Sequence, residues 1–269
     1  MLRKLTTYIF FLCLSLISLT IHAQQEQILN FDSHIIVNKN ASIDVTENIL
    51  VHANQDKILH GIVRRLPMEY LDNEKIKRLI NYQIQTIFSN QQSISYHIEH
   101  SNDELAIYIG NLDVMLSAGD YLYTIHYHVN NAISFLKDTD ELYWNVTGNE
   151  LDFPLRKAQV SVQLPPDAKI SSNTAYTGKT HDVSAVASVP NQITFTTTRP
   201  LDSGEGFVVN VSWQKGVVVE PTWLDRSKAK LPTTRTLYII PIVIIFILLS
   251  GLLFIRIRSQ RKNRKKKYY

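Results

Sequence analysis

The chain has 269 residues, of which 45% are hydrophobic and 19% are charged, and its formal net charge is +4. Cys13 is its only cysteine, which excludes a disulfide-stapled domain and leaves core burial to stabilise the fold. Eight of the 28 basic residues lie in 256–269 and two in 1–23, so 18 basic residues face 24 acidic ones in between, about −6. This acidic central region excludes an extended nucleic-acid-binding surface, which needs excess positive charge.

The N-terminal segment predicts a secretory signal peptide over 1–23. Arg3 and Lys4 precede the apolar run 8–21, and Ala23 stands before a polar stretch. This is the charge, apolar core and small-residue pattern of a cleavable signal. The run is shorter than the roughly 20 residues that a spanning helix needs. We expect cleavage after Ala23, and an uncleaved signal anchor is the alternative.

The central region 24–215 alternates with a period of two, as β-strands do. Clear runs lie at 42–52, 120–130, 158–164 and 207–213, and Glu47 is the one polar residue on the apolar face of its run. Turn-forming residues separate these runs. The pattern predicts an all-β fold, an antiparallel β-sandwich. Because Pro154 cannot donate to a strand ladder, we expect a division into two lobes, 24–152 and 154–215.

One segment of this region fits two secondary structures. Residues 73–88 place Ile76, Ile80, Ile84 and Ile87 on one side of a helix. The second half of the segment also alternates as a strand would. We favour a strand over 80–88, with a helix as the alternative.

The stretch DTDELYWNVTGN, 138–149, holds the residues that most resemble a ligand site. Asp138, Asp140, Glu141 and Tyr143 are candidate ligand-binding residues, and the acids could also serve as catalytic carboxylates. A glycosidase pair must flank a bond from two sides, about 5–10 Å apart, which one strand does not provide. We therefore favour a half-buried strand whose acids are a solvated entry that prevents edge pairing.

Histidines on neighbouring strands raise the question of a metal. His126 and His128 are two residues apart on one strand face, and His97 and His100 lie in a nearby run. A zinc site needs three or four converging ligands, and nothing in the sequence supplies the remainder. We therefore predict exposed strand histidines, no metal and no cofactor. The sequence also contains no phosphate-binding glycine loop, H-E-x-x-H motif or nucleophile elbow, which disfavours an enzyme.

The C-terminal part predicts a membrane anchor. A linker over 216–236 precedes 237–255, nineteen uncharged residues that would span about 28 Å as a helix. Every charged residue of the tail 256–269 is basic, and such a cluster beside a spanning helix marks the cytoplasmic side. The membrane-orienting residues of this tail are Arg256, Arg258, Arg261, Lys262, Arg264, Lys265, Lys266 and Lys267. The β region is then expected outside the cytoplasm.

Several segments together resemble a known family. They are DSHIIVNKNASIDVTENILV (32–51), HGIVRRLP (60–67), LAIYIGNLDV (105–114), AGDYLYTIHYHV (118–129) and DELYWNVTGNELDFPL (140–155). In this order they resemble the YciQ-like predicted membrane proteins, whose N-terminal domain of unknown function is DUF 2207. The resemblance implies a bacterial envelope protein with a secreted β domain and no catalytic residues to transfer. Leu151 departs from the family's expected tryptophan, and family members continue into further membrane helices.

Three functional hypotheses follow. We favour a single-pass membrane protein of the cell envelope, located in the plasma (inner) membrane, whose β domain binds an envelope protein or a cell-wall polymer. An extracytoplasmic hydrolase of wall glycans, using Asp138, Asp140 or Glu141, is the first alternative. A sensor that signals through 237–255 is the second. It would need a separate output partner, because the tail is only fourteen residues long.

Overall fold

The computed structural model describes residues 25–71, 77–101, 103–148, 151–178 and 180–222. The predicted signal peptide, the apolar segment 237–255 and the basic tail lie outside these residues. Within the described ranges, no helix has the length and apolar character needed to cross a membrane. These same ranges contain seventeen strands and no helix, which confirms the all-β prediction.

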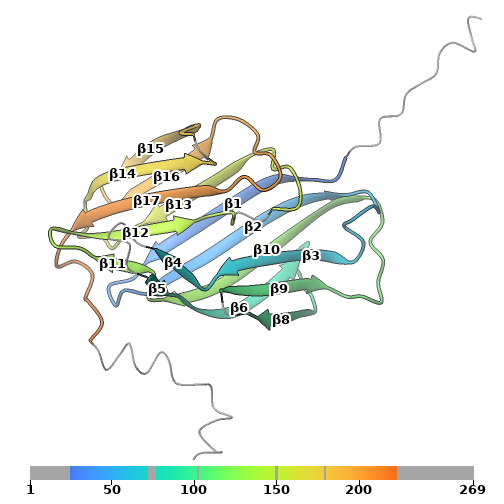
Figure 1. Ribbon diagram of the computed structural model, residues 1–269, viewed down its shortest axis with the longest axis horizontal. Coiled ribbons are helices and arrows are strands. Elements are labelled where there is room, and N and C mark those ends of the chain that lie inside the picture. The colour runs from blue at the N-terminus through green and yellow to red at the C-terminus, as the bar shows by residue number, and fades with distance from the viewer. Residues whose placement is uncertain (1–24, 72–76, 102, 149–150, 179, 223–269) are drawn as a thin grey trace, which may run out of the picture. The chain divides into compact units, whose positions relative to one another are not determined.

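The largest sheet has eight strands in the order β15-β16-β13-β1-β2-β10-β6-β7 (Figure 1). Neighbouring strands in it are antiparallel except β1 and β13, which run parallel, with Phe31 opposite Ala158. The expectation of a purely antiparallel sandwich is therefore wrong at this pair, which joins strands from both sides of Pro154. The strands of this sheet are β1 (Gln27–Val37), β2 (Ile43–Ala53), β6 (Asn81–Ser89), β7 (Gln92–Ser93), β10 (Gly119–Asn130), β13 (Ala158–Gln163), β15 (Val183–Val189) and β16 (Gln192–Thr197).

Two smaller sheets cover one face of the large sheet (Figure 1). A four-stranded sheet has the order β11-β12-β17-β14, and a three-stranded sheet has the order β3-β9-β8. A short pair, β4 with β5, accompanies them. Their strands are β11 (Ile133–Phe135), β12 (Thr139–Asn145), β17 (Phe207–Gln214), β14 (Ile170–Thr177), β3 (Gly61–Pro67), β9 (Glu104–Gly110), β8 (Tyr96–His100), β4 (Glu69–Leu71) and β5 (Lys77–Leu79).

The ambiguous segment is a strand where it was expected to be one. β6 covers Asn81–Ser89 and pairs with β10, so the interpretation of 80–88 as a strand is confirmed. The segment forms a strand because its backbone can form ladder hydrogen bonds with β10, which a helix could not do.

The core lies between the eight-stranded sheet and the two sheets that cover it. Along β2 every second residue is buried, as the alternating sequence requires. Aromatic side chains from all parts of the chain are fully buried in this layer, and the largest are Trp213, Tyr123, Tyr127, Phe31 and Phe195. The buried side chains form one hydrophobic cluster, and residues up to Glu220 form one compact unit.

A buried ion pair joins the three main sheets inside this core. Glu47 on β2 is 0% exposed and Arg64 on β3 is 4% exposed. The Arg64 guanidinium donates from Nε and Nη2 to the two carboxylate oxygens of Glu47, both at 2.7 Å. Its three remaining N–H groups donate to the carbonyl of Arg65 at 2.9 Å and to those of Val146 and Thr147, which follow β12, each at 2.8 Å. One guanidinium therefore contacts all three sheets.

The surroundings of this pair keep both charges satisfied. The Tyr127 hydroxyl on β10 donates to Glu47 Oε1 at 2.6 Å. Burial, and then the charge of Glu47, raises the pKa of Tyr127 well above its usual value, so the hydroxyl keeps its proton. The guanidinium of Arg64 also lies 5.3 Å from the centre of the Phe31 ring. The single polar residue on the apolar face of β2 is thus the centre of a fully bonded cluster.

Replacing Glu47 with glutamine should test this arrangement, because it leaves the buried Arg64 charge without its partner. We expect E47Q to lower the free energy of unfolding by about 3–5 kcal/mol. Urea titration of the full chain in detergent, followed by tryptophan fluorescence, measures the change. The matched control K39A removes the exposed pair Lys39–Asp167 and should cost less than about 1 kcal/mol. Equal losses in the two variants would contradict a special role for the buried pair.

Candidate functional site

Two facing glycines shape one end of the three-stranded sheet. Gly61 begins β3 and Gly110 ends β9, and the two residues are paired. Their φ angles are +149° and +142°, which few residues with a side chain adopt. A Cβ on Gly61 would lie 1.8 Å from the Ile109 carbonyl oxygen, and one on Gly110 would lie 2.0 Å from that of His60. Only glycine fits at either position, because the clash is with backbone.

A groove of about 220 Å³ lies over this glycine pair. The aromatic rings of His97 and Tyr108 stack at its side, 4.5 Å apart and nearly parallel. The groove is mainly apolar with a few nitrogen-bearing side chains, and it is lined by Lys57, Leu59, His60, Ile62, Val63, His97, Tyr108 and Leu112. This composition suits an apolar side chain that has a negative group beside it.

The loop after β9 presents three large apolar side chains to solvent next to this groove. Leu112 is 78% exposed, Val114 is 53% exposed and Met115 is 61% exposed. We call these three residues the apolar loop. Isolated exposed apolar residues are common, whereas these three lie together in one loop beside a groove, which makes the loop a candidate interaction site.

Hydrogen bonds hold the apolar loop in place. The Asn111 side chain accepts from the amide of Asp113 at 2.9 Å, and the Leu116 amide donates to the Leu59 carbonyl at 2.8 Å. The His60 ring is also bonded to the Val114 carbonyl at 3.0 Å. Since the backbone is tied to the groove wall, the exposed side chains are displayed by a defined loop.

The other wall of the groove is organised by a buried carboxylate. Glu26, which is 6% exposed, accepts from the backbone amides of four residues, Asn54, Asp56, Lys57 and Ile58, at 2.8–3.2 Å. Burial alone would raise the pKa of Glu26, but these amides outweigh it and hold the pKa below its usual value. Residue 26 therefore fixes the segment that leads into Leu59 and His60.

The groove and the point where the chain leaves the compact unit lie at opposite ends of β2. Gly119, at the end of the loop, pairs with Ala53 at one end of the strand. Val219 donates to the carbonyl of Lys39, which lies just before the other end of β2. Eleven strand residues at about 3.3 Å each separate the two ends by about 35 Å. Figure 1 shows the β9–β10 loop and the stretch that follows β17 on opposite sides.

With this geometry established, comparison with known proteins assigns the family. Residues 27–213 match the family described as predicted membrane protein (DUF2207) N-terminal domain, which is more than half of the chain. The chain belongs to the DUF2207 family. The family expected from the sequence is therefore confirmed, and with it the description as a predicted membrane protein of unknown function.

The chain is also similar to a curated relative and to two solved structures. The chain is 33% identical over 144 residues to the uncharacterized protein YciQ of Escherichia coli strain K12, an alignment that covers 54% of this chain and 23% of YciQ. The chain thus spans about a quarter of the length of that relative. Leukotriene A4 hydrolase from Saccharomyces cerevisiae is 8% identical with a TM-score of 0.40, covering 71% of this chain and 30% of the hydrolase. An M1 zinc metallopeptidase from Deinococcus radiodurans is 13% identical with a TM-score of 0.38, covering 68% and 42%.

The acids singled out in 138–149 do not form one site in the DUF2207 domain. Asp138 is exposed, but Asp140 is 1% exposed and bonded to Lys215 Nζ at 2.8 Å. Glu141 is 3% exposed and accepts from the Asn210 amide at 3.0 Å. The expectation of a solvated entry is therefore wrong for Asp140 and Glu141, because β12 lies between β11 and β17, and their partners Lys215 and Asn210 directly follow β17 and lie on it, respectively.

Tyr143 and the histidines also have local partners. The ring of Tyr143 is half-buried and stacks on Tyr70, with ring centres 6.2 Å apart. His126 is bonded to Thr46 at 2.9 Å and His128 to Asp44 at 2.6 Å, in both cases across the β2–β10 pair. Across the described part of the chain, no group of three or more candidate metal ligands occurs. The ligand-binding role of Asp138, Asp140, Glu141 and Tyr143 stays a prediction.

Sequence reasoning missed the apolar loop. Its signal was present, because Leu112, Val114 and Met115 stand between the turn-forming residues Asn111 and Gly119 and do not continue the alternation of either strand. No signal in the sequence pointed to Gly61 and Gly110. A side chain is excluded at each position by the backbone of a partner strand that lies about fifty residues away in the sequence.

The glycine pair gives a direct test of the groove. We expect Gly110→Ala to lower the melting temperature and to disrupt the groove, because the new methyl group meets the His60 carbonyl oxygen at 2.0 Å. Gly204→Ala is the matched control, since Gly204 also has a positive φ of +79° but no atom within 4 Å. The control should show only the backbone strain, about 1 kcal/mol. A loss in the control as large as that in G110A would contradict the proposed clash.

Glu26 predicts a pH dependence that is local to the groove. Because folding lowers the pKa of Glu26, its carboxylate contributes fully to stability above the usual pKa of 4.5. That contribution is lost as the pH falls through the folded-state pKa. Amide hydrogen exchange in residues 54–58 should therefore lose protection at acid pH, and Glu26→Gln should lose it already at neutral pH. The exposed acid Asp138 serves as the control, and Asp138→Asn should leave the profile unchanged. Unaltered protection in E26Q would refute the role of the carboxylate.

Proposed function

We propose that this chain is a single-pass envelope protein whose β domain binds a protein partner outside the cytoplasm. Membership of a family of predicted membrane proteins supports the membrane part of the proposal. The N-terminal segment 1–23 would direct export, 237–255 would span the membrane, and the basic tail 256–269 would stay in the cytoplasm. The observation that carries the binding part is the apolar loop beside its groove.

The loop supports a protein partner because of what its exposure costs. Burying a large apolar side chain is worth roughly 1.5–3 kcal/mol, and Leu112, Val114 and Met115 forgo most of that gain in the isolated domain. A partner that covers the loop recovers it. A flexible loop would lose entropy on binding, but this loop is already held by Asn111, Leu59 and His60.

The lining of the groove defines the chemistry of the partner. Leu59, Ile62 and Val63 contribute apolar side chains to the lining, and Lys57, His60 and His97 contribute basic side chains. We therefore expect an apolar side chain of the partner in the groove, with an acidic residue next to it. A neutral polysaccharide would gain little from this surface, because its hydroxyl groups need polar partners.

The alternative functions receive no comparable support from the geometry. Asp140 and Glu141 are neighbours in one strand and are bonded to different partners, so they do not face a common substrate. A hydrolase that uses Asp138, Asp140 or Glu141 would need a site that these contacts do not form. The sensor hypothesis concerns 237–255, which lies outside the described residues, and it stays a prediction.

A photoreactive amino acid at position 112, in the full chain in its native membranes, tests the proposal. We expect one discrete protein adduct from Leu112 and none from the control position Ile36, which is 39% exposed on another surface. The partner identified in this way should then be purified in its free form. It should bind the wild-type chain with a Kd about tenfold lower than its Kd for Leu112→Ser, because the substitution removes one buried leucine. Adducts with lipid alone, or equal affinity for both chains, would overturn the proposal.

A further inference from the structure

β15 forms an edge of the eight-stranded sheet and has no charged side chain to protect that edge. In the described part of the chain it pairs with β16 alone. Val186 is 63% exposed and Val189 is 48% exposed, and Ala185 and Ala187 are exposed as well. No charged residue occurs in the strand, whereas natural edge strands commonly carry lysine or an inward-pointing charge. A strand of this kind is suited to accept another strand.

The sequence of this strand is symmetric about its centre. Residues 183–189 read VSAVASV, which is the same in both directions, with Val186 in the middle. When a strand pairs antiparallel with its own copy around a two-fold axis at Val186, each residue faces an identical one. At the regular centre of the strand, Val186 would face Val186 and Ala185 would face Ala187, and no like charges would meet.

The backbone of β15 has the orientation that this pairing requires. The Thr198 amide donates to the Asp182 carbonyl, and Val183 is paired with Thr197. Because hydrogen-bonding direction alternates along a strand, residues 182, 184 and 186 point their backbone groups toward β16. The groups of Ala185 and Ala187 then point outward, whereas the Val183 amide donates to the His181 carbonyl at 2.7 Å. In a two-fold pair centred on Val186, the backbone of Ala185 forms hydrogen bonds with the backbone of Ala187 of the second copy. The two Val186 residues then face each other as a close pair without backbone hydrogen bonds between them.

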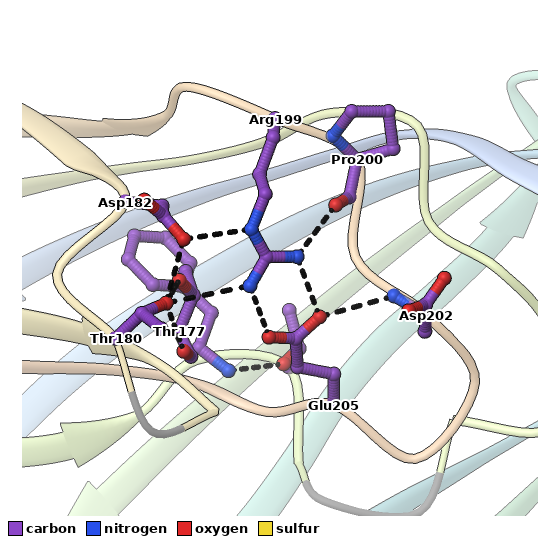
Figure 2. Close-up of polar contacts among 9 residues, drawn as sticks. Thr177, Thr180, Asp182, Arg199, Pro200, Asp202 and Glu205 are labelled. Carbon is purple, nitrogen blue, oxygen red and sulfur yellow. Dashed lines mark hydrogen bonds and ion pairs between the residues drawn. The ribbon is translucent and has the colours of Figure 1, made fainter.

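A network of polar side chains holds the start of the strand (Figure 2). Arg199 donates from Nε to Asp182 Oδ2 at 2.7 Å, and its two other nitrogens contact the carboxylate of Glu205. Thr180 donates to the same Asp182 oxygen at 2.6 Å. Asp182 immediately precedes β15, so the edge begins from a fixed point and needs little ordering before it pairs.

We propose that β15 pairs with β15 of a second copy of this chain, antiparallel and centred on Val186, so that two eight-stranded sheets join into one. The inference does not depend on the apolar loop, which lies on a different part of the domain. The β-bulge between Ala187 and Val189 lies outside the central three residues and leaves their pairing regular. A seven-residue strand pair buries less than the roughly 1,200 Å² of a standard interface, so the dimer is weak in dilute solution.

Cysteine crosslinking of the full chain reads out the register. In a Cys13→Ser background, Val186→Cys should form a disulfide-linked dimer on mild oxidation, because the Cβ atoms of such a close pair are about 4.5–5.5 Å apart. Ser184→Cys is the matched control on the same face of the strand. Position 184 would lie four residues, about 13 Å, from its own copy, beyond the reach of a disulfide. V186C should therefore crosslink and S184C should not.

A charge at the centre provides a second, independent measurement. Val186→Lys places two like charges on the two-fold axis and should weaken the dimer by about tenfold or more. Sedimentation of the full chain in detergent measures the dimer, and circular dichroism checks that this exposed substitution leaves the fold intact. The proposal is overturned if V186C and S184C crosslink equally, if V186C does not crosslink, or if V186K leaves self-association unchanged.

Discussion

The Glu47–Arg64 pair is the interaction on which the rest of this fold depends. It contacts β2 of the eight-stranded sheet, β3 of the three-stranded sheet and the residues that follow β12 of the four-stranded sheet. Apolar packing is non-directional and would tolerate sliding of one sheet over another. A guanidinium with all its donors engaged has one geometry, so it fixes how the two smaller sheets sit on the large one.

Four of the five segments in which the sequence resembles the DUF2207 family converge on this pair. The segment 32–51 contributes Glu47, 60–67 contributes Arg64, 118–129 contributes Tyr127, and 140–155 contributes the carbonyls of Val146 and Thr147. The fifth segment, 105–114, instead carries Leu112 and Val114 of the apolar loop.

The surfaces available for binding lie away from these segments or at their ends. The apolar loop follows β9, where Gly61 and Gly110 bring two strands into close contact, and β15 lies at one edge of the large sheet. The apolar loop exposes Leu112, Val114 and Met115 around a single acid, Asp113, and β15 carries no charged residue. The β domain thus combines a rigid interior, set by one buried ion pair, with exposed elements suited to association with other proteins.

Local alternation in the sequence determined much of the fold by itself. The strands at 42–52, 120–130 and 207–213 and the ambiguous strand at 80–88 follow from side chains that alternate between core and solvent, a property of each segment alone. The tertiary structure decided the parallel pairing of β1 with β13, the burial of Asp140 and Glu141, and the place of Glu47. Each of these depends on which distant strand becomes a neighbour, and only that neighbour supplies the counter-charge or amide that makes a buried carboxylate stable.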